Sequence, residues 1–232
     1  MGFDKVGVLF NERIPEARSL ALEIEDWLAE RVGEVSVCAI EDASQGECLS
    51  EFELLVTLGG DGSILHAARL TAPHAVPILG VNLGRVGFLT EAETGEWEVV
   101  LTQALSGRYW IEQRMMLRVT AWRGQEKLAE ATALNDAVVG RGSRGRAVHL
   151  RATVDGGELA TYVADGVIIA TPTGSTAYAL AAGGPILPPE LRNILLVPVA
   201  PHLSMERPIV LAEGVTVRIT VLGRRPAVLM VD

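Results

Sequence analysis

Residues 54–72 read LLVTLGGDGSILHAARLTA. The stretch starts with an apolar run typical of a buried strand, turns through glycines on both sides of Asp61, and continues with apolar residues at helical spacing. It predicts a strand, a glycine turn and a helix, the repeating unit of a parallel sheet covered by helices on both faces. The same alternation predicts further strands at 6–10, 35–40 and 76–82 and further helices at 14–32 and 96–107. We therefore expect a Rossmann-like N-terminal half, with the acidic residues 41–47 in a solvated loop.

The second half has a different pattern, and the change falls near Gly107. Residues 114–139 predict two strands about a glycine turn, and residues 149–166 predict another hairpin with an Asp-Gly turn. Further strands are expected at 167–172, 194–200, 215–222 and 227–231. We therefore predict an α/β domain over residues 1–107 and a β-rich domain over residues 108–232.

The composition argues against several classes of protein. The 232 residues are 49% hydrophobic and carry a formal net charge of −9, so a nucleic-acid or anionic-membrane surface is not expected. No apolar run reaches the roughly 18 residues that cross a bilayer, and charge appears too early in the chain for a signal peptide. We expect a compact cytoplasmic protein. Cys38 and Cys48 lack the spacing of a metal site and are expected to be buried small side chains.

The glycine turn of the first half combines Gly59, Gly60, Asp61, Gly62 and Ser63. Glycines let the backbone approach a bulky anion, and the helix that follows offers unpaired N–H groups and the positive end of its dipole. An aspartate here can hold Mg²⁺ or accept a proton. The pattern favours a phosphate-binding loop, and the alternative is an ordinary strand-to-helix turn capped by the serine.

Two polar segments of the second half suit a nucleoside. Residues 171–178, TPTGSTAY, place hydroxyls and a ring beside the small Ala177, a composition that suits a sugar and a flat base. The alternative is a Pro/Gly loop whose hydroxyls cap a helix starting at Thr176. Asn135 and Asp136 interrupt an apolar strand pattern, which costs stability unless their polar groups find partners. A turn or a sheet edge is the alternative for this pair.

Several stretches resemble one kinase family. The pentapeptide GGDGS resembles the signature shared by phosphofructokinases, diacylglycerol kinases and NAD kinases. Residues 162–178, YVADGVIIATPTGSTAY, are similar almost residue for residue to the NAD kinase signature and are followed by ALAAGGPIL. Further blocks of that family are matched in the expected order by GVNLGRVGFLT (80–90), LNDAVVGRG (134–142) and PVAPHLSMERPIVL (198–211). The resemblance covers roughly 150 residues.

The resemblance to NAD kinases implies a reaction and a set of site residues. The reaction is phosphorylation of the 2'-hydroxyl of the adenosine ribose of NAD by ATP, or by polyphosphate, to give NADP. Mg²⁺ or another divalent cation is implied as ATP's companion, with no fixed protein metal site, and the protein is expected to be a homodimer or homotetramer. Asp61 is implied as the catalytic residue, Asn135 with Asp136 as adenosine contacts, and Tyr178 as a neighbour of the nicotinamide. The implied NAD contacts are Asp61, Gly62, His66, Asn135, Asp136, Arg146, Asp165, Thr176, Ala177, Tyr178 and Ala181.

Two of these assignments also rest on local pattern. GRGSRG (140–145) is a literal G-x-G-x-x-G, but a strand-like stretch follows it, so it predicts a loop between strands rather than a dinucleotide-binding turn. Its arginines and Arg146 could meet phosphate, and the resemblance singles out Arg146. His66 lies one helical turn beyond Gly62, so its side chain can point back toward the glycine loop. His202 is expected to fix a loop.

The sequence departs from the family pattern at a few positions. Ser63 stands where threonine is commoner, Ala181 where many relatives have a serine close to the ribose, and Met205-Glu206 where Ser-Asn is usual. Relatives are expected to continue past Asp232 with a glycine and a further segment. Two rival functions stay open: a lipid or sugar kinase that shares GGDG, and a regulatory module that binds NAD without catalysis.

Overall fold

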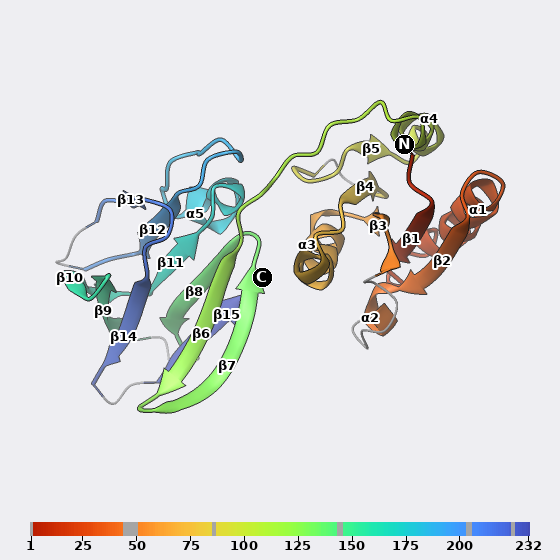
Figure 1. Cartoon of the computed structure of the whole chain (residues 1–232). Coiled ribbons are helices and arrows are strands. Elements are labelled where there is room, and N and C mark those ends of the chain that lie inside the picture. Colours follow the sequence, from red (N-terminus) through yellow and green to blue (C-terminus); the bar gives the residue numbers. More distant parts are fainter. Residues whose placement is uncertain (1, 44–50, 85–86, 143–145, 203–205, 224–225) are drawn as a thin grey trace. The chain divides into compact units, whose positions relative to one another are not determined.

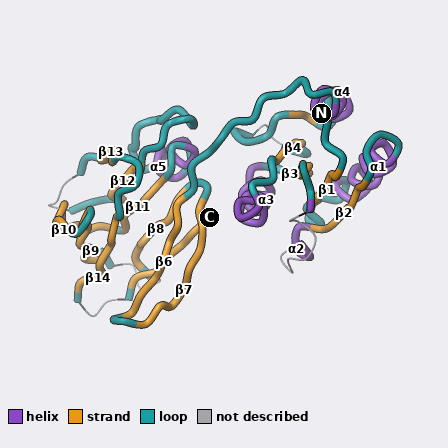
Figure 2. The backbone as a smooth tube through the Cα atoms, viewed as in Figure 1, coloured by secondary structure: helices purple, strands orange, loops and turns teal. Residues whose placement is uncertain are grey.

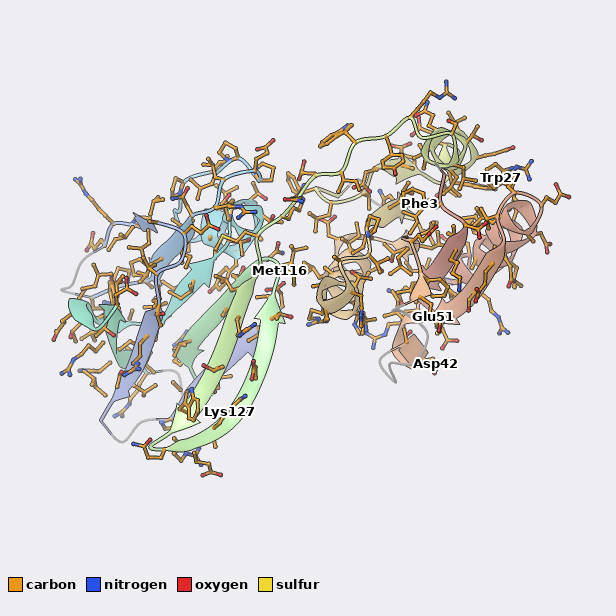
Figure 3. The ribbon with its side chains drawn as sticks, viewed as in Figure 1. Phe3, Trp27, Asp42, Glu51, Met116 and Lys127 are labelled. Atoms are coloured by element: carbon orange, nitrogen blue, oxygen red, sulfur yellow. The ribbon has the colours of Figure 1, made fainter. Side chains whose placement is uncertain are left out.

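The computed structural model describes residues 2–43, 51–84, 87–142, 146–202, 206–223 and 226–232. It divides into two compact units, Met1–Ile111 and Glu112–Asp232 (Figure 1). The division falls a few residues beyond Gly107, where the sequence pattern changes. One reason is that Tyr109 stacks on Phe3, with ring centroids 5.1 Å apart, and so belongs to the first unit (Phe3 is labelled in Figure 3).

The first unit is a parallel sheet with strand order β2-β1-β3-β4-β5. Its strands are β1 (Lys5–Phe10), β2 (Glu34–Ala39), β3 (Leu54–Gly59), β4 (Ile78–Asn82) and β5 (Ala92–Glu93). Its helices are α1 (Ala17–Ala29), α2 (Ile40–Ala43), α3 (Asp61–Thr71) and α4 (Trp97–Leu105), with a 3-10 turn at Ala72–His74. The expected Rossmann-like α/β organisation is confirmed.

Alternate residues of the central strands pack on opposite faces of this sheet, as strand geometry requires. Val8 and Val56 point to the face covered by α1 and α4, and Leu9 and Leu55 to the face covered by α2 and α3. Figure 2 shows these helices as purple coils around the orange strands. Both faces are therefore buried, which explains why the strands read as continuous apolar runs.

One local prediction is wrong. The loop expected over residues 41–47 begins instead with the helix α2. Ile40 and Ala43 are buried against Leu9 and Leu55, so apolar anchors fold this segment onto the sheet although its exposed residues are acidic. Residues 44–50, which include Cys48, lie outside the described residues.

The regular structure of the second unit consists almost entirely of antiparallel strands. A five-stranded sheet has the order β13-β12-β11-β8-β15, a three-stranded sheet the order β10-β9-β14, and β6 pairs with β7. The strands are β6 (Leu117–Arg123), β7 (Glu126–Ala133), β8 (Asp136–Arg141), β9 (Val148–Val154), β10 (Gly157–Ala164), β11 (Gly166–Ala170), β12 (Ile194–Val199), β13 (Ile209–Leu211), β14 (Val217–Leu222) and β15 (Ala227–Val231). The expected β-rich second half is confirmed.

The core of this unit lies where two of its sheets face each other. Leu150 of β9 and Tyr162 of β10 pack against Val167 of β11 and Leu196 of β12, all fully buried. The opposite face of β11 and β12 packs on Ala179 of the short helix α5 (Tyr178–Ala181). Among the described residues, no helix is long and apolar enough to cross a membrane.

The prediction of two strands over residues 114–139 is wrong in part, because this segment contributes to three strands. It forms β6 and β7, and then the chain leaves that pairing at Leu134 and Asn135 to enter β8 in the five-stranded sheet. The polar Asn-Asp pair therefore marks the point where the chain passes from one sheet to another, rather than the middle of a strand.

Candidate active site

The glycine loop joins β3 to α3 in the first unit. Gly60 is the N-cap residue in an extended conformation, and α3 begins at Asp61. No atom lies within 4 Å of the Cβ positions that a side chain on Gly60 or Gly62 would occupy. The backbone on both sides of Asp61 is thus open to a ligand, as a phosphate-binding loop needs. At Gly59, in contrast, a side chain would collide with the Ser63 hydroxyl.

Ser63 is not the cap of this helix. It lies in the first turn of α3, is buried, and its hydroxyl has no hydrogen-bond partner among the described residues. The alternative of an ordinary turn capped by Ser63 is therefore wrong.

Asp61 is held in place by a second loop. Its Oδ2 accepts a hydrogen bond from the backbone N–H of Phe88 at 3.1 Å, and its Oδ1 accepts one from the N–H of Leu89 at 3.0 Å. A Cβ at Gly87 would collide with the Asp61 carboxylate. Each carboxylate oxygen keeps a further lone pair, so the group can still accept a proton or a hydroxyl hydrogen bond. Sequence reasoning missed this cradle, although Gly87 lies in the family-like block 80–90.

His66 lies on α3 beyond the glycine loop. Burial first, and the positive charge of Arg69 second, lower its pKa below the ordinary value, while Glu41 acts in the opposite direction. An Arg69 Nη2 lies 3.4 Å from the His66 Nδ1. Because arginine only donates, Nδ1 must accept, and the neutral ring carries its proton on Nε2. That Nε2 is buried and lacks a partner among the residues described.

In the second unit, residues 134–136 form the corner at which the chain passes from β7 to β8. This Asn135 corner is hydrogen-bonded to the TPTGST loop (residues 171–176). The N–H of Thr171 donates to the carbonyl of Asn135 at 2.9 Å, and the Thr171 hydroxyl donates to the carbonyl of Leu134 at 2.5 Å. A Cβ at Gly174 would collide with the backbone of Asn135. The two segments singled out from the sequence are therefore side by side, although some 40 residues separate them.

Asp136 is a half-buried carboxylate beside another one. Burial, and secondarily the negative charge of Asp232, raise the pKa of Asp136 from 3.8 to about 6. None of the described residues donates a hydrogen bond to its side chain. Because this carboxylate is only partly buried and receives no donor from the described residues, its oxygens are available to water or to a ligand.

One hydroxyl of the TPTGST loop, that of Ser175, binds backbone groups of the protein. Ser175 is fully buried, where its Oγ donates to the Pro172 carbonyl at 2.6 Å and accepts from the Leu187 N–H at 2.9 Å. It therefore joins the loop to the following segment instead of facing a sugar. Thr176 ends a 3-10 turn (Thr173–Thr176), and the helix starts at Tyr178 rather than at Thr176. Of the predicted contacts here, Thr176 and Ala177 are half-buried and Tyr178 and Ala181 are exposed.

Asp165 and Arg146 lie away from this corner. Asp165 precedes β11, and its carboxylate pairs with Arg141 at 3.3 Å, whereas Asp136 lies opposite Ala170 at the other end of that strand. The strand has five residues, so the two aspartates are roughly 16 Å apart. Arg146 is exposed on the loop before β9. Arg144 and Met205 lie outside the described residues.

Arg114 holds the TPTGST loop in place, a role that the sequence did not indicate. Its guanidinium donates to the Thr173 hydroxyl at 3.2 Å and pairs with Glu112 at 2.6 Å. It fixes the TPTGST loop to the extended segment that begins the second unit. A single arginine in an apolar strand pattern gave no signal of this role.

Known proteins are similar to this chain over nearly its whole length. The sequence profile of the ATP-NAD kinase N-terminal domain matches residues 38–109, and that of the ATP-NAD kinase C-terminal domain matches residues 134–232. The NAD kinase of Heliobacterium modesticaldum is 42% identical over 98% of this chain and 83% of its own length. That of Moorella thermoacetica is 43% identical over 94% of this chain and 72% of its own length.

Two solved structures share the fold. The yeast NADH kinase, solved with NADH, has a TM-score of 0.86 and 30% identity and covers 100% of this chain and 76% of its own. An NAD kinase from Archaeoglobus fulgidus, solved with ATP, has a TM-score of 0.73 and 26% identity and covers 98% of this chain and 84% of its own. With the identity of the curated relatives and the matches to both domain profiles, these similarities confirm the resemblance seen in the sequence: the chain belongs to the NAD kinase family.

Proposed function

We propose that this chain transfers the γ-phosphoryl group of ATP to the 2'-hydroxyl of the adenosine ribose of NAD, giving NADP and ADP. The observation that carries the proposal is the Asp61 carboxylate, fixed by the Phe88 and Leu89 amides at the start of α3 between two open glycines. Phosphoryl transfer depends mainly on positioning and on neutralising charge. A carboxylate held at a phosphate-binding turn suits both demands.

Asp61 acts on the acceptor hydroxyl. The 2'-oxygen attacks the γ-phosphorus, the bond from that phosphorus to the oxygen bridging to the β-phosphate breaks, and ADP leaves. The hydroxyl proton passes to the Asp61 carboxylate, which stays oriented because two backbone N–H groups bind its oxygens. The open backbone at Gly60 and Gly62 and the first turn of α3 receive the donor phosphates.

A divalent cation, Mg²⁺ by preference, accompanies ATP in this proposal. Among the described residues, His, Cys, Asp and Glu form no group of three or more that could hold a metal. Mg²⁺ bound with nucleotide phosphates needs only one or two protein carboxylates, and Asp61 would be one of them if it oriented the hydroxyl through the ion instead of acting as the base. The ion would supply charge neutralisation for the phosphates.

NAD binds through the second unit. The Asn135 side chain and the Asp136 carboxylate, to which none of the described residues donates, hold the adenosine part, for which ribose hydroxyls are suitable donors. Thr176, Ala177 and Tyr178 contact the dinucleotide further along, with Tyr178 near the nicotinamide. The remaining proposed contacts are Gly62, His66, Arg146, Asp165 and Ala181. Because Asp165 lies far from Asp136 along β11, it contacts a different part of the ligand.

Three finer properties belong to the same proposal. Polyphosphate is a second candidate donor, because the glycine loop offers N–H groups to phosphate of any origin. The protein is expected to be a homodimer or homotetramer. It is placed in the cytoplasm, where NAD and ATP are both available.

The decisive experiment is incubation with NAD, ATP and Mg²⁺, followed by a coupled assay that detects NADP. We expect NADP to form, and turnover to stop when EDTA removes the cation. NADH, sugars and diacylglycerol serve as alternative acceptors, and polyphosphate as alternative donor. Phosphorylation of a sugar or lipid in preference to NAD, or NAD binding without NADP formation, would overturn the proposal.

The raised pKa of Asp136 predicts that NAD binding depends on pH. The ionised carboxylate accepts hydroxyl hydrogen bonds more strongly than the protonated acid does, so the KM for NAD should rise as the pH falls below about 6. The stability effect has the opposite sign. Because the fold raises this pKa from 3.8, the native state holds the proton more tightly, and stability falls as pH rises from 3.8 to about 6.

Asp136→Asn tests this assignment. The variant should bind NAD more weakly than the wild type, and its KM for NAD should no longer change with pH in this range. The KM for ATP serves as the internal control. An acid-side rise in the KM for NAD that persists in Asp136→Asn would assign the titration to another group.

A further inference from the structure

We propose that Asp232 is a positioning residue for the dinucleotide: its side chain fixes the backbone from which Asn135 and Asp136 project. Oδ2 of Asp232 accepts hydrogen bonds from the N–H groups of Leu134 at 3.0 Å and Asn135 at 2.9 Å. Oδ1 accepts one from the N–H of Asp136 at 2.7 Å. Three successive backbone amides thus converge on one carboxylate. The inference rests on the proposed NAD contacts of Asn135 and Asp136.

This arrangement occurs where regular pairing cannot satisfy the backbone. The chain leaves β7 after Ala133 and enters β8 at Asp136, so Leu134 and Asn135 belong to neither strand. Consecutive amides that point the same way form an anion-binding concavity. Here the Asp232 carboxylate occupies this concavity. Asp232 is brought there because it directly follows β15, which pairs with β8.

The carbonyls of the same corner are bound from the TPTGST side. Thr171 donates its hydroxyl to the Leu134 carbonyl and its N–H to the Asn135 carbonyl. Asp232 binds the N–H groups of residues 134–136, and Thr171 binds the carbonyls of Leu134 and Asn135. The backbone of this corner is therefore fixed through both its donors and its acceptors. The side chains of Asn135 and Asp136 are then left for a ligand, which is how a supporting residue preorganises a binding site.

Asp232 also acts on Asp136 by its charge. The partners of Asp136 on the adjoining strands are uncharged at this point: β11 places Ala170 opposite it, and β7 ends at Ala133. Asp232 follows β15 and lies beside Asp136, and among the described residues its charge is the one that disfavours ionisation of Asp136, in addition to burial. Asp232 therefore acts on the NAD site in two ways, through its hydrogen bonds to the backbone and through its charge. Different substitutions remove the one or the other.

Two substitutions of Asp232 separate these contributions. Asp232→Asn removes the charge and turns an amide N–H₂ toward at least one backbone N–H. We expect a rise of roughly tenfold or more in the Kd for NAD at alkaline pH, and a shift of the acid limb of binding to lower pH. Burial is the larger cause of the raised pKa of Asp136, so the pKa stays partly raised in this variant. Asp232→Glu keeps the charge but displaces the carboxylate, so the Kd should rise while the acid limb stays in place.

Asp155→Asn is the matched control. Asp155 also accepts a backbone hydrogen bond across this unit, from the Thr216 N–H at 2.8 Å, but lies at the β9–β10 turn. It should leave both NAD binding and its pH dependence unchanged. The Kd is measured by calorimetry, the KM for ATP and kcat by the NADP assay, and folding by circular dichroism. ATP parameters should change little in every variant.

The outcomes are distinct. A folded Asp232→Asn protein with wild-type affinity for NAD overturns the inference. Failure of both Asp232 variants to fold assigns the residue to stability and also overturns it. Asp136→Ala tests the underlying site: if that variant binds NAD normally, the proposed NAD contacts are wrong. If it binds poorly while both Asp232 variants bind well, only the positioning role fails.

Discussion

Asp61→Asn is expected to lower kcat by roughly 10²- to 10⁴-fold, the range that general-base catalysis contributes. Asparagine has the size of aspartate but cannot accept a proton at neutral pH, and it brings no charge to attract a cation. NAD should still bind, because its proposed adenosine contacts lie on the second unit. The NADP assay gives kcat, and calorimetry gives the affinity for NAD.

The cradle around Asp61 adds a cost in stability. One of the two backbone N–H groups, from Phe88 or Leu89, would face the asparagine N–H₂ and lose its acceptor. Because the bond from Phe88 is exposed and water can replace it, we expect a loss of about 0.5–1.5 kcal/mol in the free energy of unfolding. Asp4→Asn is a suitable control, because Asp4 also accepts a backbone bond in this unit, from the Gly33 N–H at 3.0 Å. Near-normal kcat in a folded Asp61→Asn protein would remove Asp61 from the mechanism.

Gly87→Ala is expected to lower kcat by roughly 100-fold, although residue 87 need not touch either substrate. The new methyl group would occupy the position of the Asp61 carboxylate. Either that carboxylate rotates away from the Phe88 and Leu89 amides, or the loop moves and carries them off. A displacement of about 1 Å in a reacting group is enough for a loss of this size.

A second glycine of the same unit provides the control for this prediction. At Gly95 no atom lies within 4 Å of the added Cβ, so Gly95→Ala should keep its kcat. The affinity of Gly87→Ala for NAD should also stay close to that of the wild type. If folded Gly87→Ala turned over at the wild-type rate, the loop would not be what positions Asp61.

The parallel sheet and the glycine loop were predictable because their signals are local. Buried strands read as apolar runs, and GGDGS lies between such a run and a helical pattern. The start of α2 was not predictable in the same way, since its acidic residues conceal two buried anchors, Ile40 and Ala43. The exit of the chain from β7 was also missed, because apolar residues continue past it.

The supports of the site could not be read from the sequence at all. Leu89, the partner of Asp61, lies 28 residues away, and Asp232 lies 97 residues from Asn135. Hydrogen bonds that join such distant residues leave no periodic trace. The family-like blocks showed which segments matter, but not that Gly87 is there to make room for Asp61, or that Ser175 binds backbone rather than ligand.

The strand order of the second unit also affects when the NAD corner can form during synthesis. β8 lies between β11 and β15, and β15 is made roughly 90 residues after β8. While the ribosome adds that length of chain, the first unit can already fold, since all of its strands and helices lie within residues 1–111 and are made earlier. The amides of residues 134–136, in contrast, wait for a carboxylate that has not yet been synthesised. A nascent chain can therefore have a finished phosphate loop while its dinucleotide site is still incomplete.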